Sequence, residues 1–432
     1  MTAIPRLSTS HVRSATSRWY YLAASFFIMQ STGFFGVIDR LKYGQWAEKT
    51  GDPFTQSLNV LQILVAIFLF WVGYSKSKTV SLGATLLLIV VAYLFMSVFW
   101  SVDPETSVRR SVVYLFFVIG VIGIANTLSG DEYLDLLRKL VFLSAIISLV
   151  FLVISPVTVL MADGALCGIF PHKNFMGQVM AAGVLASLHG MRTGRGHRRS
   201  CAAMIVVFVG LAFASRSATA MMTIFLFCAV EILLVISGRY FMIILSIVSI
   251  PALLLILLSP DLILDFLGKD ASLTGRTDLW RFVDIDIAQR PLLGWGFDAF
   301  WALGNPAANE ISANLGWHVP HAHNGLRELL LEVGGVGTSF FAIVFARNIW
   351  IATRCLRTPV KELGKTLLLC CGGILLVGVS EEVLVDPSQI SVGMLFVMGL
   401  MGERMLRAGA QQQSLRPIVP RLRSASARGP AL

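Results

Sequence analysis

TGRTDLWRFVDIDIAQRPLLGWGFDAFW (residues 274–301) and GWHVPHAHNGLRELLLEVGGVG (residues 316–337) are the two halves of the longest polar stretch in this chain. The stretch is rich in tryptophan, histidine, arginine and glycine, and apolar runs lie before and after it. A polar, aromatic loop between membrane spans is where a membrane enzyme carries its functional residues. We therefore expect the rest of the chain to hold residues 273–337 at a membrane surface.

The composition excludes an ordinary soluble domain. Of 432 residues, 56% are hydrophobic and only 14% are charged, whereas soluble domains carry about 25% charged residues. Apolar runs of about 20 residues recur along the chain, which indicates a polytopic helical membrane protein. A membrane barrel would instead show apolar residues alternating with polar ones in segments of about 10 residues.

The hydropathy pattern predicts about twelve spans and an all-α polytopic fold with one large outer loop that contains short amphipathic helices. The first run follows a basic tail as a signal peptide would, but it is long and lacks a clear cleavage site, so we expect an uncleaved span. The spans are expected near 19–37, 57–74, 80–100, 111–128, 140–161, 175–190, 201–215, 217–237, 240–259, 335–353, 366–381 and 389–403.

The distribution of basic residues predicts the orientation. With the N-terminus in the cytoplasm, most lysines and arginines fall in inner segments, including MRTGRGHRRS (191–200), as the positive-inside rule requires. The net charge of +10 therefore reflects topology and does not indicate nucleic acid. The expected parts are a cytoplasmic basic tail (1–18), spans one to nine (19–259), a periplasmic catalytic loop (260–334), spans ten to twelve (335–403) and a disordered basic cytoplasmic tail near anionic lipid (404–432).

The cysteines predict a fold without disulfides. On this topology only Cys167 of the six cysteines faces outside, so it has no partner for an internal disulfide. No CxxC or HExxH pair with the spacing of metal ligands occurs in the sequence.

Two short helices are expected in the outer loop. Thr277 can cap the first, which would carry Trp280, Val283 and Ile287 on one face and end at Pro291. The glycines of LLGWGF then predict a turn.

The second helix is NGLRELLLEV, capped by Asn324 and ended by Gly334 and the glycine after it. This places His321 and His323 at a helix N-terminus, where the partial positive charge favours anions.

Four basic residues are candidates for binding an anion. Arg216, in the short outer turn SRSAT, would clamp phosphate with its bidentate fork, or would simply snorkel to the interface. Arg276 would be a second clamp, or a solvated loop arginine. His172 and Lys173 in GIFPHKNFMGQ lie at the start of a span, where they would bind phosphate or a sugar hydroxyl.

His321 and His323 are the natural candidates for proton transfer near neutral pH. They would also suit a metal ion, but the sequence shows no third ligand at a convincing spacing, and no metal is expected. A structural role is the ordinary alternative for a histidine.

Other polar and aromatic residues are interpreted as structural. Asp284 and Asp286 resemble a DxD motif of metal-dependent sugar transferases, but two residues apart on a helix they point in different directions, so they are assigned to the surface. Glu381 and Glu382 end a span on the outer side, where one of them would pair with an arginine, but interfacial charge is the preferred interpretation. The tryptophans of the loop would stack on sugar rings or, as is commoner, anchor the loop at the interface.

Taken together, these segments resemble the O-antigen ligase and polymerase family of bacterial inner-membrane proteins. The resemblance rests on SRSAT, on GRTDLW followed by PLLGWGFDAF, and on HAHNGLRELLLEVGGVG, in this order, over about residues 165–345. The segment GIFPHKNFMGQ resembles the exopolysaccharide-polymerase branch.

The resemblance implies a GT-C-like glycosyltransferase of the inner membrane, with both termini cytoplasmic, that needs no metal or other cofactor. It would take glycan from undecaprenyl diphosphate on the periplasmic face and invert the anomeric carbon, with a chain-length regulator and export machinery as further partners and no nucleic acid. The implied roles are catalysis by His323, with His321 as the second candidate, and diphosphate binding by Arg216 and Arg276. Lys173 and His172 would line the donor or acceptor site and contribute to diphosphate binding, and Asn324, Trp280 and Glu332 are assigned supporting roles.

Three functions remain open. The first is polymerisation of repeat units into exopolysaccharide, and the second is a ligase that moves finished glycan to lipid A-core or another acceptor. The third is a transporter or flippase without catalysis, although internal repeats and charges at mid-membrane, which are typical of transporters, are not evident.

Overall fold

The computed structural model describes residues 18–43, 53–78, 80–236, 276–302, 304–383 and 386–414. Within these ranges the chain is all-helical, and the nearest approach to a sheet is a single antiparallel bridge between Leu160 and Leu166. The expected span at 240–259, the loop residues 260–275 and residues 1–17 and 415–432 of the expected tails lie outside the described residues. Residues 404–414, which were expected in the disordered C-terminal tail, instead continue helix α17 (Ile390–Ser414).

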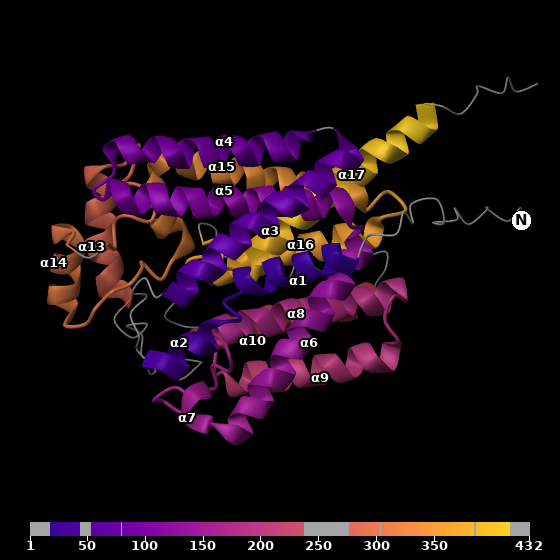
Figure 1. Ribbon diagram of the computed structural model, residues 1–432, viewed down its shortest axis with the longest axis horizontal. Helices are drawn as coiled ribbons and strands as arrows, with labels where there is room; N and C mark the ends of the chain where they lie inside the picture. Colours follow the sequence, from indigo (N-terminus) through magenta and orange to yellow (C-terminus); the bar gives the residue numbers. More distant parts are fainter. Residues whose placement is uncertain are drawn as a thin grey trace, which may run out of the picture.

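Each of the other expected spans falls on a described helix or on two consecutive helices (Figure 1). The described helices are α1 (Arg18–Ser31), α2 (Gly36–Tyr43), α3 (Pro53–Ser77), α4 (Leu82–Met96), the short 3₁₀ helix η2 (Ser97–Trp100), α5 (Pro104–Thr127), α6 (Gly130–Ile154), α7 (Pro156–Val159), α8 (Lys173–Thr193), α9 (Arg198–Ala214), α10 (Ala218–Ile236), α13 (Arg276–Gln289), α14 (Pro306–Leu315), α15 (Gly325–Cys355), α16 (Lys361–Gly378) and α17 (Ile390–Ser414).

Five described helices, namely α3, α4, α5, α6 and α15, are long and apolar enough to cross a membrane. A sixth span is formed if α1 and α2 count as one, although they are bent by 53°. The expected first span at 19–37 falls on this bent pair, in which α1 ends at Ser31 and Gly33 adopts a left-handed φ of 67° before α2 begins. The total of twelve spans stays a prediction.

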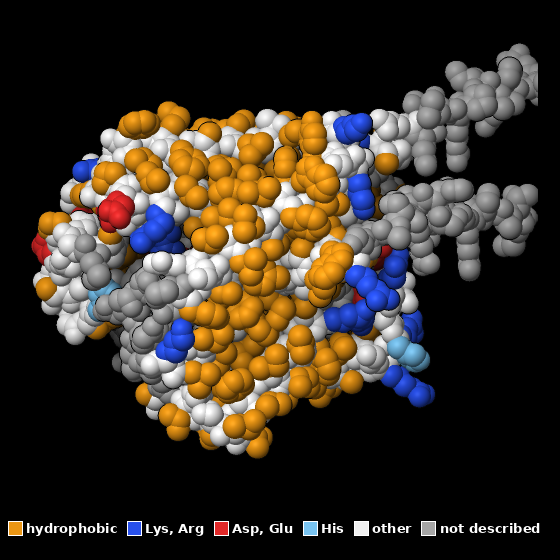
Figure 2. Space-filling view, in the orientation of Figure 1, with side chains coloured by type: hydrophobic (Ala, Val, Ile, Leu, Met, Phe, Trp, Pro, Cys, Tyr) orange, Lys and Arg blue, Asp and Glu red, His pale blue; other side chains and the backbone are white. Residues whose placement is uncertain are grey.

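The surface of the molecule fits a bilayer. Figure 2 shows hydrophobic side chains in a broad belt between the two ends, while charged side chains gather toward the ends. In α3 only 17% of the apolar window is buried inside the protein. An exposed apolar surface of this size is not stable in water, so the chain is a multi-pass membrane protein.

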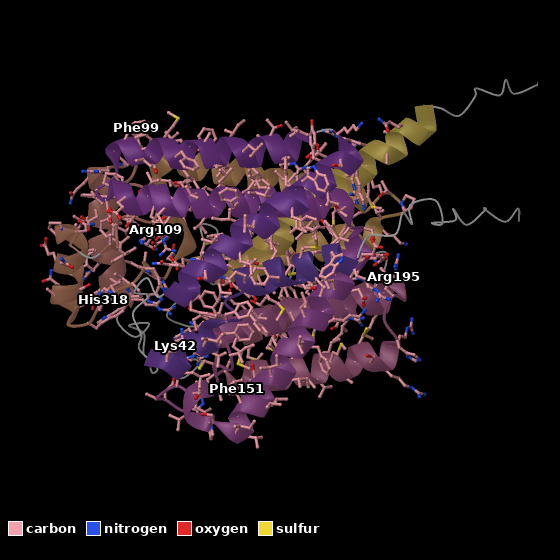
Figure 3. The ribbon with its side chains drawn as sticks, viewed as in Figure 1. Lys42, Phe99, Arg109, Phe151, Arg195 and His318 are labelled. Carbon is pink, nitrogen blue, oxygen red and sulfur yellow. The ribbon has the colours of Figure 1, made fainter. Side chains whose placement is uncertain are left out.

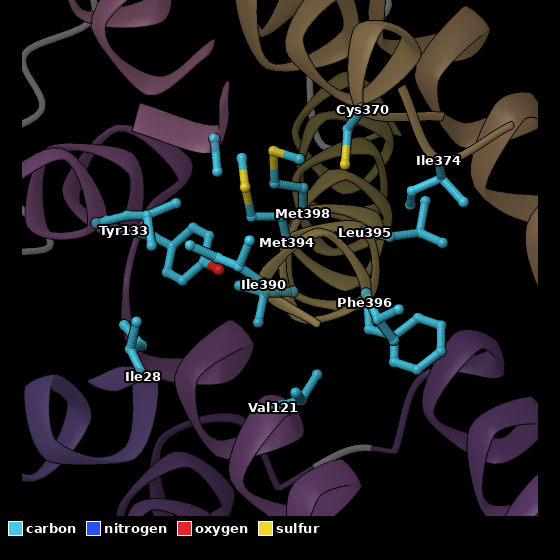
Figure 4. Close-up of a cluster of buried hydrophobic side chains, with 14 of the residues drawn as sticks. Ile28, Val121, Tyr133, Cys370, Ile374, Ile390, Met394, Leu395, Phe396 and Met398 are labelled. Atoms are coloured by element: carbon cyan, nitrogen blue, oxygen red, sulfur yellow. The ribbon is translucent and has the colours of Figure 1, made fainter. Parts of the chain in front are cut away.

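The core lies where α17 passes among the other helices. Figure 4 shows Met394 and Met398 of α17 facing Tyr133, with Cys370 and Ile374 of α16 on the other side. These side chains are buried and apolar in character, apart from the tyrosine hydroxyl. The six cysteines are all free, so helix packing without disulfides holds the fold, as the sequence predicted.

Glycines allow the helices to approach closely, as is common in membrane proteins. A Cβ added at Gly123 of α5 would lie 2.4 Å from the backbone carbon of Leu69 in α3. The pair α3 and α5 therefore packs backbone against backbone at this point.

The two ends of the bundle differ in character. Figure 3 shows His318 at the end that carries α13 and α14, and Arg195 at the opposite end, where α8 connects to α9. At that opposite end, Arg192 pairs with Glu231 and, at 3.0 Å, with Glu362. Buried charges inside a membrane protein normally pair in this way, and these pairs join α8, α10 and α16.

A second, smaller hydrophobic core supports α13 and α14. It contains Leu279 and Val283 of α13, Ile311 of α14, and Trp295 and Phe300 from the segment between these helices. The outer segment is thus a packed unit that lies at one end of the bundle (Figure 1).

The expected face of α13 is confirmed, since Val283 is buried and both Trp280 and Ile287 pack against the small core. The helix already includes Arg276, however, so Thr277 lies inside its first turn and the expectation that Thr277 is the cap is wrong. Gly294 and Gly296 have φ values of 70° and 105°. The turn predicted in LLGWGF is therefore confirmed, since such φ values favour glycine.

Asn324 caps α15 as predicted, because its side-chain oxygen accepts a hydrogen bond from the backbone N–H of Arg327 at 3.0 Å. The predicted stop is also confirmed: Gly334 has non-helical angles (φ 64°, ψ −173°) and marks a kink inside α15. A Cβ at Gly334 would lie 2.3 Å from the backbone oxygen of Leu292, so the kink allows the outer segment to pack directly on the helix.

Candidate functional site

The histidine pair lies in a tight turn just before α15. The backbone N–H of His323 donates to Nδ1 of His321 at 3.2 Å, and the two ring centroids are 3.9 Å apart. His323 has a φ of 50°, which is unfavourable for a residue with a Cβ and recurs at functional sites. Asn324 also anchors this turn, since its Nδ2 donates to the carbonyl oxygen of Val379 at 3.1 Å.

His323 is a neutral imidazole. Burial disfavours its charged form, and the positive charge of His321 and Arg276 adds to the effect, so that its pKa falls to about 2. Its Nδ1 atom is buried and has no hydrogen-bond partner among the described residues. The ring therefore presents a buried nitrogen that is able to accept a proton.

Glu381 lies beside the histidines, just after the end of α16. Its Oε1 accepts a hydrogen bond from Nδ2 of Asn174 at 2.7 Å and lies 3.5 Å from Nη2 of Arg276. Burial raises the pKa of this carboxyl. The preferred interpretation of Glu381 as an interfacial charge is wrong, because the side chain is buried beside Asn174, Arg276 and the histidine pair, and the alternative of an arginine partner is confirmed.

Arg276 points into the same region from the first residue of α13. Its Nη1 donates to the backbone oxygen of Ser380 at 3.0 Å, and its side chain is 22% exposed. The alternative of a solvated loop arginine is therefore wrong. The guanidinium is held at the edge of the site, and part of it faces outward.

Arg216 and Lys173 lie at one side of the site, which we call the flank, and both contact Asp163. Nη1 of Arg216 donates to the backbone oxygen of Asp163 at 2.7 Å, and Nζ of Lys173 lies 2.5 Å from its Oδ2. The hydrogen bond from Lys173, followed by one from the backbone N–H of Ala165, lowers the pKa of Asp163. Arg216 itself is exposed and has a φ of 51°, so it is both strained and accessible to a ligand.

His172 connects this flank to the histidine pair. It caps α8 by accepting the backbone N–H of Asn174 at its Nδ1, at 3.3 Å. Burial lowers its pKa, and so does the charge of Lys173 and Arg276. Oγ1 of Thr219 lies 2.8 Å from Oγ of Ser380, which places the short turn before α10 against the segment that carries Glu381.

The arrangement suits an anion such as a diphosphate. The guanidiniums of Arg216 and Arg276 and the ammonium of Lys173 lie on the segments around the neutral imidazole of His323, next to a helix N-terminus, and arginine forks match phosphate oxygens. The structure thus brings together the four predicted basic residues and both predicted histidines, which come from segments distant in sequence: Arg216, Arg276, Lys173, His172, His321 and His323.

A metal ion is the other ligand that the histidines allow. The described residues contain one suitable group, His321, His323 and Glu381, whose ligand atoms lie within 4.8 Å of one another. The statement that no third ligand stands nearby is therefore wrong, because Glu381 lies far away in sequence but close in space. A divalent cation there would compete with Arg276 for Glu381 and would face further positive charge, so the charges favour an anion.

Three tryptophans of the outer segment have structural contacts. Trp280 donates its indole N–H to the backbone oxygen of Ala322 at 3.0 Å, and Trp295 donates to that of Asp286 at 3.0 Å. Trp301 donates to Oε1 of Glu328 at 2.8 Å. Their indole N–H groups therefore hold the outer segment together, while stacking of their rings on a sugar stays a prediction.

The expectation for the aspartate pair is half right. Asp284 is exposed and forms a two-pronged ion pair with Arg327, at 2.8 and 3.0 Å. Asp286 is buried, with its Oδ1 accepting from Gln289 at 3.0 Å, so its assignment to the surface is wrong. Burial raises the pKa of Asp286.

Glu332 is a buried residue of α15, at the point where this helix contacts the segment 294–298. Its backbone oxygen accepts the N–H of Gly296 at 2.9 Å, so the contact supports the outer segment. Sequence reasoning missed Glu328 and Asp163, whereas Asn174 belongs to the PHKN segment that it proposed to bind phosphate or a sugar hydroxyl. The signal available for Glu328 was its place in the first turn of a helix that follows two histidines.

Comparison with known proteins agrees with this picture. The O-antigen ligase family profile matches residues 202–342. Exopolysaccharide production protein ExoQ of Rhizobium meliloti (strain 1021) is 24% identical over 391 residues, covering 84% of this chain and 82% of that protein. The profile contains the SRSAT turn, α13 and the histidine turn. On these matches, the chain is similar to the O-antigen ligase and polymerase type of membrane protein.

Proposed function

We propose that this protein is a membrane glycosyltransferase that polymerises undecaprenyl-diphosphate-linked oligosaccharide repeat units into exopolysaccharide. The transfer would take place at the periplasmic face of the inner membrane, without a metal, and would invert the anomeric carbon. The observation that carries the proposal is the meeting of a neutral His323, whose Nδ1 is unpartnered, with Arg276 and Glu381. A proton acceptor and an anion-binding group stand there side by side.

In the proposed reaction, an acceptor hydroxyl oxygen attacks the anomeric carbon of the donor. The bond from that carbon to the diphosphate oxygen breaks, and its electron pair leaves with the diphosphate. Arg276 and Arg216, together with Lys173, stabilise the leaving charge. The hydroxyl proton passes to His323.

The low pKa of His323 has a specific consequence for this mechanism. Positive neighbours contribute to the depression, so a bound diphosphate, which brings negative charge, raises the basicity of the ring. Glu381 acts in the same direction once its carboxyl is ionised. His323 thus becomes an effective base when the donor is present.

A ligase is the second candidate, because the matching family profile is described as O-antigen ligase. Ligase and polymerase share the donor and the chemistry of the leaving group, and they differ in the acceptor. A gene deletion separates them: loss of a polymerase leaves single lipid-linked repeat units, whereas loss of a ligase leaves long lipid-linked chains.

A chain-length regulator and export machinery are proposed partners of the polymerase.

The direct test uses purified protein in lipid nanodiscs with undecaprenyl-diphosphate repeat unit. We expect lipid-linked oligomers from the wild type and a loss of about a hundredfold or more in the His323→Ala variant, since general base catalysis contributes roughly 10²–10⁴ in rate. His318→Ala is the matched control, because His318 is an exposed histidine of the same segment. Equal rates for the His323→Ala variant and the wild type would exclude His323 as the base, and no product from the wild type would exclude a polymerase.

A further inference from the structure

Ala322, the residue between the two histidines, is held on both sides of its backbone. Its side chain is completely buried. Its N–H donates to Oε2 of Glu328 at 2.5 Å, and its carbonyl oxygen accepts the indole N–H of Trp280 at 3.0 Å. The peptide groups that carry His321 and His323 are therefore attached to two different helices, α15 and α13.

The Glu328 side chain joins the histidine turn to a third segment. It is 1% exposed, and its Oε1 accepts the indole N–H of Trp301 at 2.8 Å while Oε2 accepts the N–H of Ala322. Both oxygens thus face N–H donors. An ionised carboxylate satisfies this demand, since it accepts at both oxygens and donates at neither. Burial raises the pKa of Glu328 to about 7, while the hydrogen bonds from Ala322 and Trp301 act in the opposite direction and favour the ionised form.

Burying a carboxylate costs free energy, so the groups around Glu328 must stabilise it. An ionised carboxylate buried without partners is strongly destabilising. Glu328 lies in the first turn of α15, where the partial positive charge of the helix N-terminus stabilises a negative side chain. The N–H groups of Ala322 and Trp301 stabilise it further. The protein is therefore built to hold a buried hydrogen-bond acceptor next to Ala322.

We propose that Glu328 is a positioning residue for the transfer reaction. By holding Ala322, it keeps the strained backbone of His323 in place, so that the imidazole stays beside Arg276 and Glu381. The proposal rests on the proposed function for its effect on rate. Its effect on the geometry of the turn is independent of that function.

Two substitutions test the acceptor pattern. In Glu328→Gln the side chain keeps its shape, but it offers one acceptor to two donors, and its NH₂ meets an N–H. Trp301→Phe removes one of those donors and keeps an aromatic ring. In the double variant, the glutamine oxygen is therefore free to accept from Ala322.

We expect Glu328→Gln to lower kcat about tenfold or more, as loss of a buried hydrogen bond to a charged group implies. Binding of the lipid-diphosphate donor should stay unchanged, because Arg276 and Arg216 are untouched. The double variant with Trp301→Phe should be more active than Glu328→Gln alone. Glu310→Gln, an exposed glutamate of α14, is the matched control and should equal the wild type.

A measurement that does not depend on activity distinguishes failure of the proposed function from failure of the positioning role of Glu328. Diethyl pyrocarbonate modification of His321 and His323, measured by mass spectrometry, should be faster in Glu328→Gln and should slow again in the double variant. If the wild type makes no oligomers but this pattern holds, the proposed function falls and the positioning role stands. Wild-type rates and reactivity in Glu328→Gln, or a double variant worse than both single variants, would overturn the proposal.

Discussion

Nη2 of Arg276 lies 3.5 Å from Oε1 of Glu381, although 105 residues separate the two in the chain. The distance is long for an ion pair, and the same carboxyl oxygen already accepts a bond from Asn174 at 2.7 Å. The orientation of the guanidinium is therefore fixed, but its contact with the Glu381 carboxylate is weak. This is a suitable state for a group that binds a diphosphate when it arrives.

Replacement of Arg276 by lysine should reduce activity about a hundredfold, in the range found when one stabilising donor is removed. Lysine keeps the charge, but it cannot contact Ser380 and a phosphate with a planar fork. The comparison is Arg281→Lys on the same helix, whose side chain is 84% exposed. Oligomer formation per minute in nanodiscs measures both, and equal activity of the two variants would remove Arg276 from the site.

The pH dependence should identify Glu381 and not His323. With a pKa of about 2, His323 stays neutral from pH 4 to pH 8. Burial raises the pKa of Glu381, so its carboxylate is lost, as pH falls, at a higher pH than for an ordinary carboxyl group. We therefore expect kcat/KM of the wild type to decline as the pH falls and Glu381 becomes protonated. Glu381→Gln should lower kcat/KM and flatten this decline at acid pH. An unchanged acid limb in Glu381→Gln would assign the titration to another group.

Removal of metal ions should leave the reaction unaffected. The group His321, His323 and Glu381 has the geometry for a divalent ion, but Arg276 competes for the carboxylate. Treatment with EDTA followed by the oligomer assay should give the untreated rate. A loss of activity that added Zn²⁺ restores would show that the site holds a metal and that the proposed metal-independent mechanism is wrong.

Asn324→Ala should cost both stability and activity. The substitution removes the cap of α15, worth about 1 kcal/mol, and the bond to Val379. Asn305→Ala removes a comparable cap from α14 and is the matched control. Both should lower the Tm, whereas only Asn324→Ala should reduce oligomer formation, since only that cap adjoins the histidines. Equal activity losses would point to a general effect of unfolding.

Much of the architecture follows from local chemistry. Apolar runs can lower their free energy only by helix formation in lipid, so the helical class and most span positions were predictable. The same holds for the Asn324 cap and the break at Gly334, because capping and left-handed φ values depend on a few adjacent residues. The bend between α1 and α2 was not predictable from hydropathy, which does not report backbone angles.

The sequence by itself determined which residue types carry the site: the arginines, the histidine turn and the family to which these motifs belong. Only the tertiary structure decided which distant groups meet. Glu381, for which an interfacial charge was the preferred interpretation, is a neighbour of Arg276, and Glu328, to which no role was assigned from the sequence, contacts Ala322. The physical reason is that burial and pairing of a charge depend on groups many residues away, brought together by helix packing, and no local pattern in the chain records them.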